Sequence, residues 1–151
     1  MKAKSFFLIA LLFIMAMLLY FFINPSYERS LEAKFYYETG MYEKAYKLAK
    51  EAFELDPYNK MAVTIMTQSQ YALRYVRYIQ NAKKYIRQIE QMLQEGEVDD
   101  KKRAKIRTIA SIMVESYKKL APSVVVDKTL IKEAKSYYEQ FSRLLEKAHK
   151  F

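Results

Sequence analysis

The chain has no cysteine, one histidine, two glycines and three prolines among its 151 residues. Without cysteine there is no disulfide framework, no thiolate zinc site and no thiol nucleophile. One imidazole, that of His149, cannot build a site that needs several, and two glycines are too few for a phosphate-binding loop. Glycine and proline are also too scarce for the turns of a β-sandwich or barrel. The composition therefore favours an all-α protein that is not an enzyme and holds no cofactor or metal.

Charged side chains are missing from residues 6–23. At about 1.5 Å per residue, a helix over this segment is roughly 27 Å long, close to the ~30 Å hydrocarbon thickness of a bilayer. A helix satisfies its own backbone hydrogen bonds, which lipid cannot do. Asn24-Pro25 ends the segment, because proline disfavours helix in the residue before it. The sequence predicts a transmembrane helix over residues 6–23.

This apolar segment resembles an uncleaved signal-anchor. A cleavable signal has an apolar core of about 7–15 residues followed by small residues at the cleavage site. Here the apolar run is longer, and its exit over residues 20–25 contains no small residue. Residues 1–5 form the short basic region that precedes the span, with Lys2 and Lys4. We therefore expect the segment to stay attached as an anchor.

The charges that flank the segment predict its orientation. Cytoplasmic flanks carry an excess of Lys and Arg. Lys2 and Lys4 lie directly before the span, whereas Arg29 and Lys34 on the far side are mixed with glutamates. We expect the N-terminus in the cytoplasm and the body outside it, which in a bacterium means an inner-membrane protein with a periplasmic body.

Residues 26–59 show helical periodicity on both sides of Gly40, which is suited to the end of a helix. Leu31 and Phe35 mark an apolar face of the first helix, and Asp56-Pro57 ends the second. The apolar positions of the second helix recur every three or four residues: Tyr42, Ala45, Ala49, Ala52 and Phe53. The pattern predicts an antiparallel helix hairpin.

The hairpin resembles a tetratricopeptide repeat (TPR), whose 34-residue pattern has small residues where its two helices touch. The residues that carry the resemblance are Ala33, Tyr36, Gly40-Met41-Tyr42, Ala45, Ala52 and Leu55-Asp56-Pro57-Tyr58-Asn59. Ala45 follows Tyr36 by nine positions and Pro57 follows Ala45 by twelve, as in the family. The resemblance implies a concave face whose ligand contacts come from Tyr27, Ser30, Lys34, Tyr37 and Glu38, and from Met61, Thr64, Gln68 and Tyr71 on the next helix.

The repeat is not followed by a second one, and residues 60–151 are predicted to form a helical bundle. We expect helices over about 60–95, 101–120 and 127–150, separated by Gly96 and by Ala121-Pro122. Asp99 or Asp100, and then Asp127, are suited to cap the last two helices. A single repeat cannot bury its own faces, so these helices or another chain must cover the hairpin.

The candidate partner-binding residues are Lys34, Tyr37, Thr64, Gln68, Tyr71, Arg74 and Arg77. Tyrosine supplies a large contact area at a low entropy cost, so Tyr37 and Tyr71 are suited as aromatic anchors. The alternative is that these side chains pack against residues 101–151. The arginines belong to a basic stripe beside Tyr71, Tyr75, Tyr78 and Tyr85 that could stack bases, meet anionic lipid or form a solvated edge.

Taken together, these features predict a membrane-anchored adaptor or scaffold that binds partner proteins, similar to small anchored repeat proteins of bacterial envelopes. A structural subunit of a secretion, pilus or motility apparatus is the alternative. A basic polyanion- or lipid-binding protein is a third interpretation, favoured by 19 Lys+Arg against 10 Asp+Glu in residues 60–151. Nucleic acid is disfavoured if the body lies outside the cytoplasm, and self-association stays open.

Overall fold

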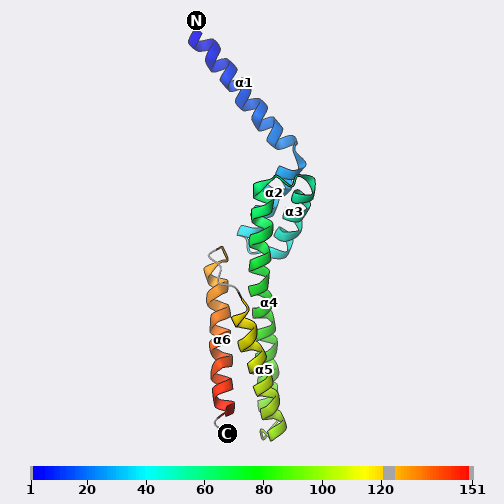
Figure 1. Ribbon diagram of the computed structural model, residues 1–151, viewed down its shortest axis with the longest axis vertical. Coiled ribbons are helices and arrows are strands. Elements are labelled where there is room, and N and C mark those ends of the chain that lie inside the picture. Colours follow the sequence, from blue (N-terminus) through cyan, green and yellow to red (C-terminus); the bar gives the residue numbers. More distant parts are fainter. Residues whose placement is uncertain (1, 121–124, 150–151) are drawn as a thin grey trace. The chain divides into compact units, whose positions relative to one another are not determined.

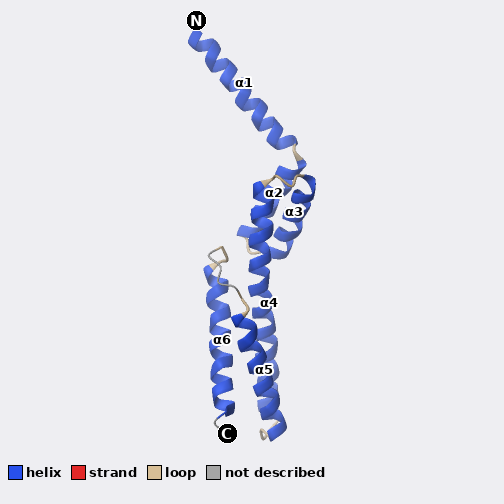
Figure 2. Ribbon diagram, viewed as in Figure 1, coloured by secondary structure: helices blue, strands red, loops and turns tan. Residues whose placement is uncertain are grey.

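The computed structural model describes residues 2–120 and 125–149 (Figure 1). These residues form six α-helices and no strand (Figure 2), which confirms the all-α prediction for the described part of the chain. The helices are α1 (Lys2–Ile23), α2 (Pro25–Glu38), α3 (Tyr42–Leu55), α4 (Lys60–Gln94), α5 (Asp100–Lys118) and α6 (Lys128–His149). Helices α4 and α5 begin and end within about two residues of the predicted bounds, and α6 begins within one, whereas α1 begins four residues before the predicted span, at Lys2. The expected break at Ala121-Pro122 and the end of the last helix at Lys150 fall outside the described residues.

The chain divides into two compact units, Met1–Gln70 and Tyr71–Phe151. The boundary between the units lies inside α4, between residues 70 and 71. The reason is that the first turns of α4 belong to the core of the hairpin, since the buried Ile65 joins the cluster formed by α2 and α3.

In the first unit, α2 and α3 form the predicted hairpin. Gly40 joins them with φ +79°, a left-handed conformation that glycine adopts without steric penalty. The helices meet through small, fully buried side chains, which allow a close approach of the two backbones: Ala33, Ala45, Ala49 and Ala52. The buried face of α2 differs from the one expected, because Leu31 and Phe35 are exposed while Ser26 and Ser30 are buried.

A buried network of hydrogen bonds connects the helices of this unit. Asn59, fully buried, accepts hydrogen bonds at Oδ1 from the backbone N–H groups of Met61 (3.1 Å) and Ala62 (3.2 Å), and so caps the start of α4. Its Nδ2 donates to the Ser26 hydroxyl (2.9 Å), the Ser26 carbonyl (3.2 Å) and the Ser30 hydroxyl (3.2 Å). The Ser26 hydroxyl donates onward to the Ala52 carbonyl at 2.8 Å. One amide side chain therefore links α4 to α2, and through Ser26 to the end of α3.

The second unit contains α5, α6 and residues 71–94 of α4. Two of the predicted caps are present, because Asp99 Oδ1 accepts from the Lys102 N–H at 2.7 Å and Asp127 Oδ1 accepts from the Thr129 N–H at 2.6 Å. All three helices contribute to one core: Tyr75, Tyr78, Ile79, Ala82, Ile89 and Met92 of α4, Ile106, Ile109, Ala110, Met113 and Val114 of α5, and Ala134 and Phe141 of α6.

Considered one at a time over the described residues, none of the helices is long and apolar enough to cross a membrane. Phe6–Tyr20 and Pro25–Glu38 satisfy that test only as a pair, with a bend between them. The helix predicted over residues 6–23 is present as the main part of α1, and its insertion into a bilayer stays a prediction.

Candidate interaction surfaces

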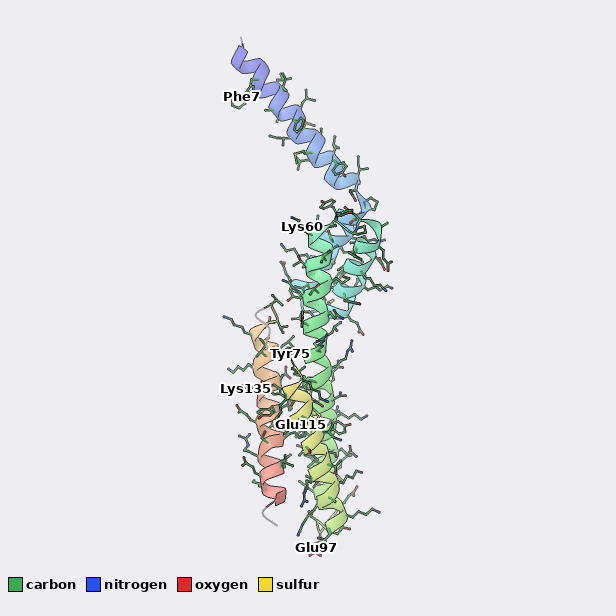
Figure 3. The ribbon with its side chains drawn as sticks, viewed as in Figure 1. Phe7, Lys60, Tyr75, Glu97, Glu115 and Lys135 are labelled. Atoms are coloured by element: carbon green, nitrogen blue, oxygen red, sulfur yellow. The ribbon has the colours of Figure 1, made fainter. Side chains whose placement is uncertain are left out.

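The first candidate surface is α1 itself. Every large apolar side chain from Phe6 to Tyr20 is more than half exposed, and the fraction reaches 79% at Phe7 (Figure 3). The exposed side chains are distributed all around the helix, because the whole segment is apolar. A helix that is hydrophobic on every side is one that a protein core or a membrane must cover.

The second surface is the outer face of α2. Leu31 and Phe35 lie one turn apart and are 56% and 60% exposed. Two glutamates flank this apolar pair along the helix: Glu28 precedes Leu31 by three residues, and Glu38 follows Phe35 by three. Leu31, Phe35, Glu28 and Glu38 are called the α2 patch below.

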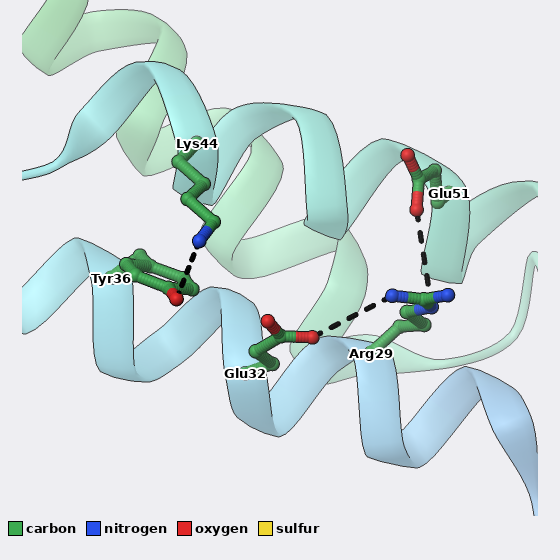
Figure 4. A network of polar contacts seen from close by, with 5 residues as sticks. All are labelled: Arg29, Glu32, Tyr36, Lys44 and Glu51. Atoms are coloured by element: carbon green, nitrogen blue, oxygen red, sulfur yellow. Dashed lines mark hydrogen bonds and ion pairs between the residues drawn. The ribbon is translucent and has the colours of Figure 1, made fainter.

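Beside the α2 patch, polar contacts connect α2 with α3 (Figure 4). Arg29 reaches Glu32 at 3.6 Å on its own helix and Glu51 of α3 at 3.9 Å. The Lys44 ammonium lies 3.8 Å from the centre of the Tyr36 ring. All these side chains are partly or largely exposed, so we expect the contacts to orient the two helices with little effect on stability.

The residues predicted on α2 divide between surface and core. Lys34 is exposed and forms an ion pair with Glu38 at 3.8 Å. Tyr37 is half-buried and packs against the hairpin core, where its ring meets that of Tyr42 edge to face at 5.4 Å. A Tyr37 substitution would therefore disturb the hairpin as well as any contact with a partner.

The residues predicted on the first turns of α4 are also divided. Thr64 is exposed, but its hydroxyl donates to the Lys60 carbonyl at 2.7 Å and so bonds within its own helix. Gln68 is half-buried. In the first unit, Lys34 and Thr64 are thus the predicted residues that lie on the surface.

In the second unit, Arg74 and Arg77 are exposed on α4, while Tyr71 is half-buried against the core. The Arg74 guanidinium lies 5.3 Å from the centre of the Tyr71 ring, within cation–π range. The structure therefore brings Tyr71 and Arg74 together and leaves the two arginines accessible to a partner.

The neighbouring tyrosines are part of the core. Tyr75 and Tyr78 are each 4% exposed, and the Tyr78 ring lies 5.6 Å from that of Tyr117, which stacks on Tyr138 at 4.5 Å. Burial, followed by the influence of Tyr117 and Tyr138, raises the pKa of Tyr78. Its hydroxyl has no hydrogen-bond partner among the described residues. Base stacking needs an exposed ring face, so neither Tyr75 nor Tyr78 is available for it.

A further surface, which the sequence did not indicate, is a groove between α4 and α6 in the second unit. Its apolar lining includes Ile86 and Leu93 of α4 and Leu144 of α6, and Leu93 is 49% exposed. Charged residues lie beside these: Glu90 on α4, and Arg143 and Lys147 on α6. This site is called the α4/α6 groove below.

Across residues 2–120 and 125–149, no group of three or more His, Cys, Asp or Glu side chains is placed to hold a metal ion. Comparison with known proteins found no matching family model, no matching curated protein and no matching solved structure. The function therefore has to be inferred from the surfaces described above.

Proposed function

We propose that the chain is a membrane-anchored adaptor, held in a bilayer by residues 6–23 and binding partner protein through the surfaces of its two helical units. The observation that carries this proposal is α1, whose apolar side chains are exposed along its length. Burying one such side chain is worth about 1.5–3 kcal/mol, so a helix with more than ten of them in water is strongly driven into lipid. Tethering then raises the effective concentration of the units near other membrane proteins.

The orientation proposed for this anchor follows the flanking charges. Lys2 and Lys4 keep the N-terminus in the cytoplasm, and both units then lie outside it, in the periplasm if the cell is a bacterium. In that compartment nucleic acid is not available as a partner. A protein is the partner class that both location and surface chemistry favour.

Within the first unit we propose that the hairpin is a single TPR-like repeat. The burial of Ala33 and Ala45 at the contact of its helices and the left-handed Gly40 support this assignment. The α2 patch, with Lys34 next to it, is then the surface offered to the partner. In the second unit, Arg74 and Arg77 offer exposed positive charge.

Anchoring is tested in the full chain with Met15→Arg, which places a charge near the middle of residues 6–23. An arginine at the centre of a membrane helix costs about 2.5–3.5 kcal/mol on insertion scales. We expect the wild-type chain and the matched control Met15→Leu to resist extraction from membranes by alkaline carbonate, and Met15→Arg to be extracted in larger part. Wild-type chain recovered in the soluble fraction, or lacking its first 24 residues, would contradict the anchor.

Adaptor function is tested with photo-crosslinking residues in cells. We expect a crosslinker at Phe35 to give one defined protein adduct, and one at Lys47, an exposed position on α3, to give none. Leu31→Asp should remove the Phe35 adduct while leaving helical content unchanged, because Leu31 is already in contact with water. If no adduct forms at Phe35 in an anchored chain, the α2 patch is not the binding surface.

A further inference from the structure

The α4/α6 groove has features that suit it to a second copy of the same chain. One wall, on α4, carries Glu90 between Ile86 and Leu93; the other, on α6, carries Arg143 and Lys147 around Leu144. None of these three charged residues takes part in an ion pair among residues 2–120 and 125–149. The two walls therefore carry opposite charges that are not used within the unit.

The helices that form the groove run in the same direction. Lys83 of α4 pairs with Glu133 of α6 at 2.8 Å, and further along both helices residues 86–93 of α4 lie opposite residues 140–147 of α6. Because both segments advance together, Glu90 and Arg143 lie at similar heights along the bundle. These equal heights decide which charged residues would face each other if a second copy bound symmetrically.

We propose that two copies associate through their α4/α6 grooves about a twofold axis parallel to these helices. Twofold rotation places like helices diagonally, so α4 of each copy lies beside α6 of the other. Rotation about this axis preserves height, so Glu90 of one copy faces Arg143 and Lys147 of the other, and the pairing occurs twice. Ile86, Leu93 and Leu144 of both copies form the apolar centre of a four-helix seam.

The proposed anchor favours association of two copies, and this part of the inference rests on it. With the axis along the helices, residues 71–94 of α4 run in the same direction in both copies. Anchoring in one membrane also raises the effective concentration of the copies, and a modest contact area is then enough for association. An antiparallel arrangement would bring Glu90 opposite a different height of α6 and lose the charge pairing.

The test uses the full chain in detergent micelles, with mass measured by light scattering and mixed species detected through two different tags. Glu90→Lys alone places the new lysine against Arg143 at both contacts, and Arg143→Glu alone places the new glutamate against Glu90 at both. We expect each variant by itself to dimerise at least about ten-fold more weakly than the wild type. Mixed together, the two variants restore opposite charges at both contacts, so the mixed dimer should form within about three-fold of the wild-type affinity.

A merely structural role of these residues would not produce the preference for mixed dimers, and circular dichroism of each variant checks the fold. The inference is overturned by a monomeric wild type, which would leave the groove to a different protein or to no partner. It is equally overturned by a wild-type dimer that both substitutions leave intact, which would place the contact outside the groove. Dimerisation in micelles is measured separately from carbonate extraction, so failure of the dimer and failure of the anchor give different results.

Discussion

Replacing Asn59 by alanine tests whether one buried amide holds the first unit together. The substitution removes the acceptor that caps α4 at the Met61 and Ala62 N–H groups. It also removes the donor that reaches Ser26 and Ser30 on α2. Asn59, Ser26 and Ser30 are all buried, so the groups that lose this amide are not in contact with bulk water.

The expected loss is the sum of two contributions. Loss of an asparagine cap costs about 1 kcal/mol, and depriving buried serine acceptors of their donor costs about 1–3 kcal/mol. We therefore expect Asn59→Ala to lower the free energy of unfolding by about 2–4 kcal/mol. Asn59→Ser keeps a capping oxygen but is too short to reach α2, so it should recover about 1 kcal/mol of that loss.

The measurement is urea unfolding of the full chain in detergent, combined with hydrogen exchange read segment by segment. Amides of α2 and α3 should exchange faster in Asn59→Ala, while those of α5 and α6 keep their protection. Tyr58→Ala is the matched control, because Tyr58 is adjacent in sequence and 91% exposed. A loss below about 0.5 kcal/mol, no larger than that of an ordinary surface substitution, would refute the reasoning.

Other positions give sharper or simpler tests of the same structure. Phe141→Ala empties a fully buried site in the second unit, and a loss of about 3–5 kcal/mol is expected by urea unfolding, with Lys135→Ala as an exposed control on α6. Gly40→Ala should cost about 1 kcal/mol, from the left-handed backbone alone, because a Cβ there meets no atom within 4 Å. Tyr78→Phe removes a buried hydroxyl that has no described partner, so it should leave stability unchanged or raise it by about 1 kcal/mol, and a loss would mean that the hydroxyl is bonded. The pKa of Tyr78 is raised in the folded state, so its contribution to the free energy of unfolding is complete below about pH 10 and is lost at higher pH, where the unfolded phenol ionises first. Urea midpoints above pH 10 should therefore fall less steeply in Tyr78→Phe than in the wild type.

The helices could be predicted from sequence because periodicity and end signals agreed. Asp99, Asp127 and Gly40 occupy the cap and turn positions expected of them. The prediction of which face of α2 is buried was wrong. Periodicity identifies the face that carries apolar side chains, but α2 buries Ser26 and Ser30 instead. Those serines are buried at low cost because Asn59 donates to both, a compensation that becomes visible only when residues about 30 apart are brought together.

The candidate surfaces were harder to predict than the helices, since tyrosine suits a core and an interface equally well. For Tyr37 and Tyr71 the sequence left two possibilities open, accessible anchors or packing within the chain, and both side chains are half-buried against their own units. Arg74 and Arg77 are exposed, as charged residues on a helix flank usually are. The α4/α6 groove had no sequence signal of its own, because its lining residues come from two helices and lie about 50 positions apart in the sequence.

The two exposed apolar surfaces of the first unit differ in the partner that their charges allow. Along α1 no charge interrupts residues 6–23, so entry into lipid leaves no charged group without water. On α2, Glu28 and Glu38 flank Leu31 and Phe35; because Lys34 pairs with Glu38, Glu28 is the charge that anionic headgroups repel most directly. A protein can instead place basic side chains opposite the glutamates and apolar ones between them, which gives specificity as well as affinity. If the α2 patch bound lipid, charge reversal at Glu28 and Glu38 would strengthen membrane retention of the Met15→Arg variant; if it binds protein, the same reversal should abolish the Phe35 adduct and leave retention unchanged.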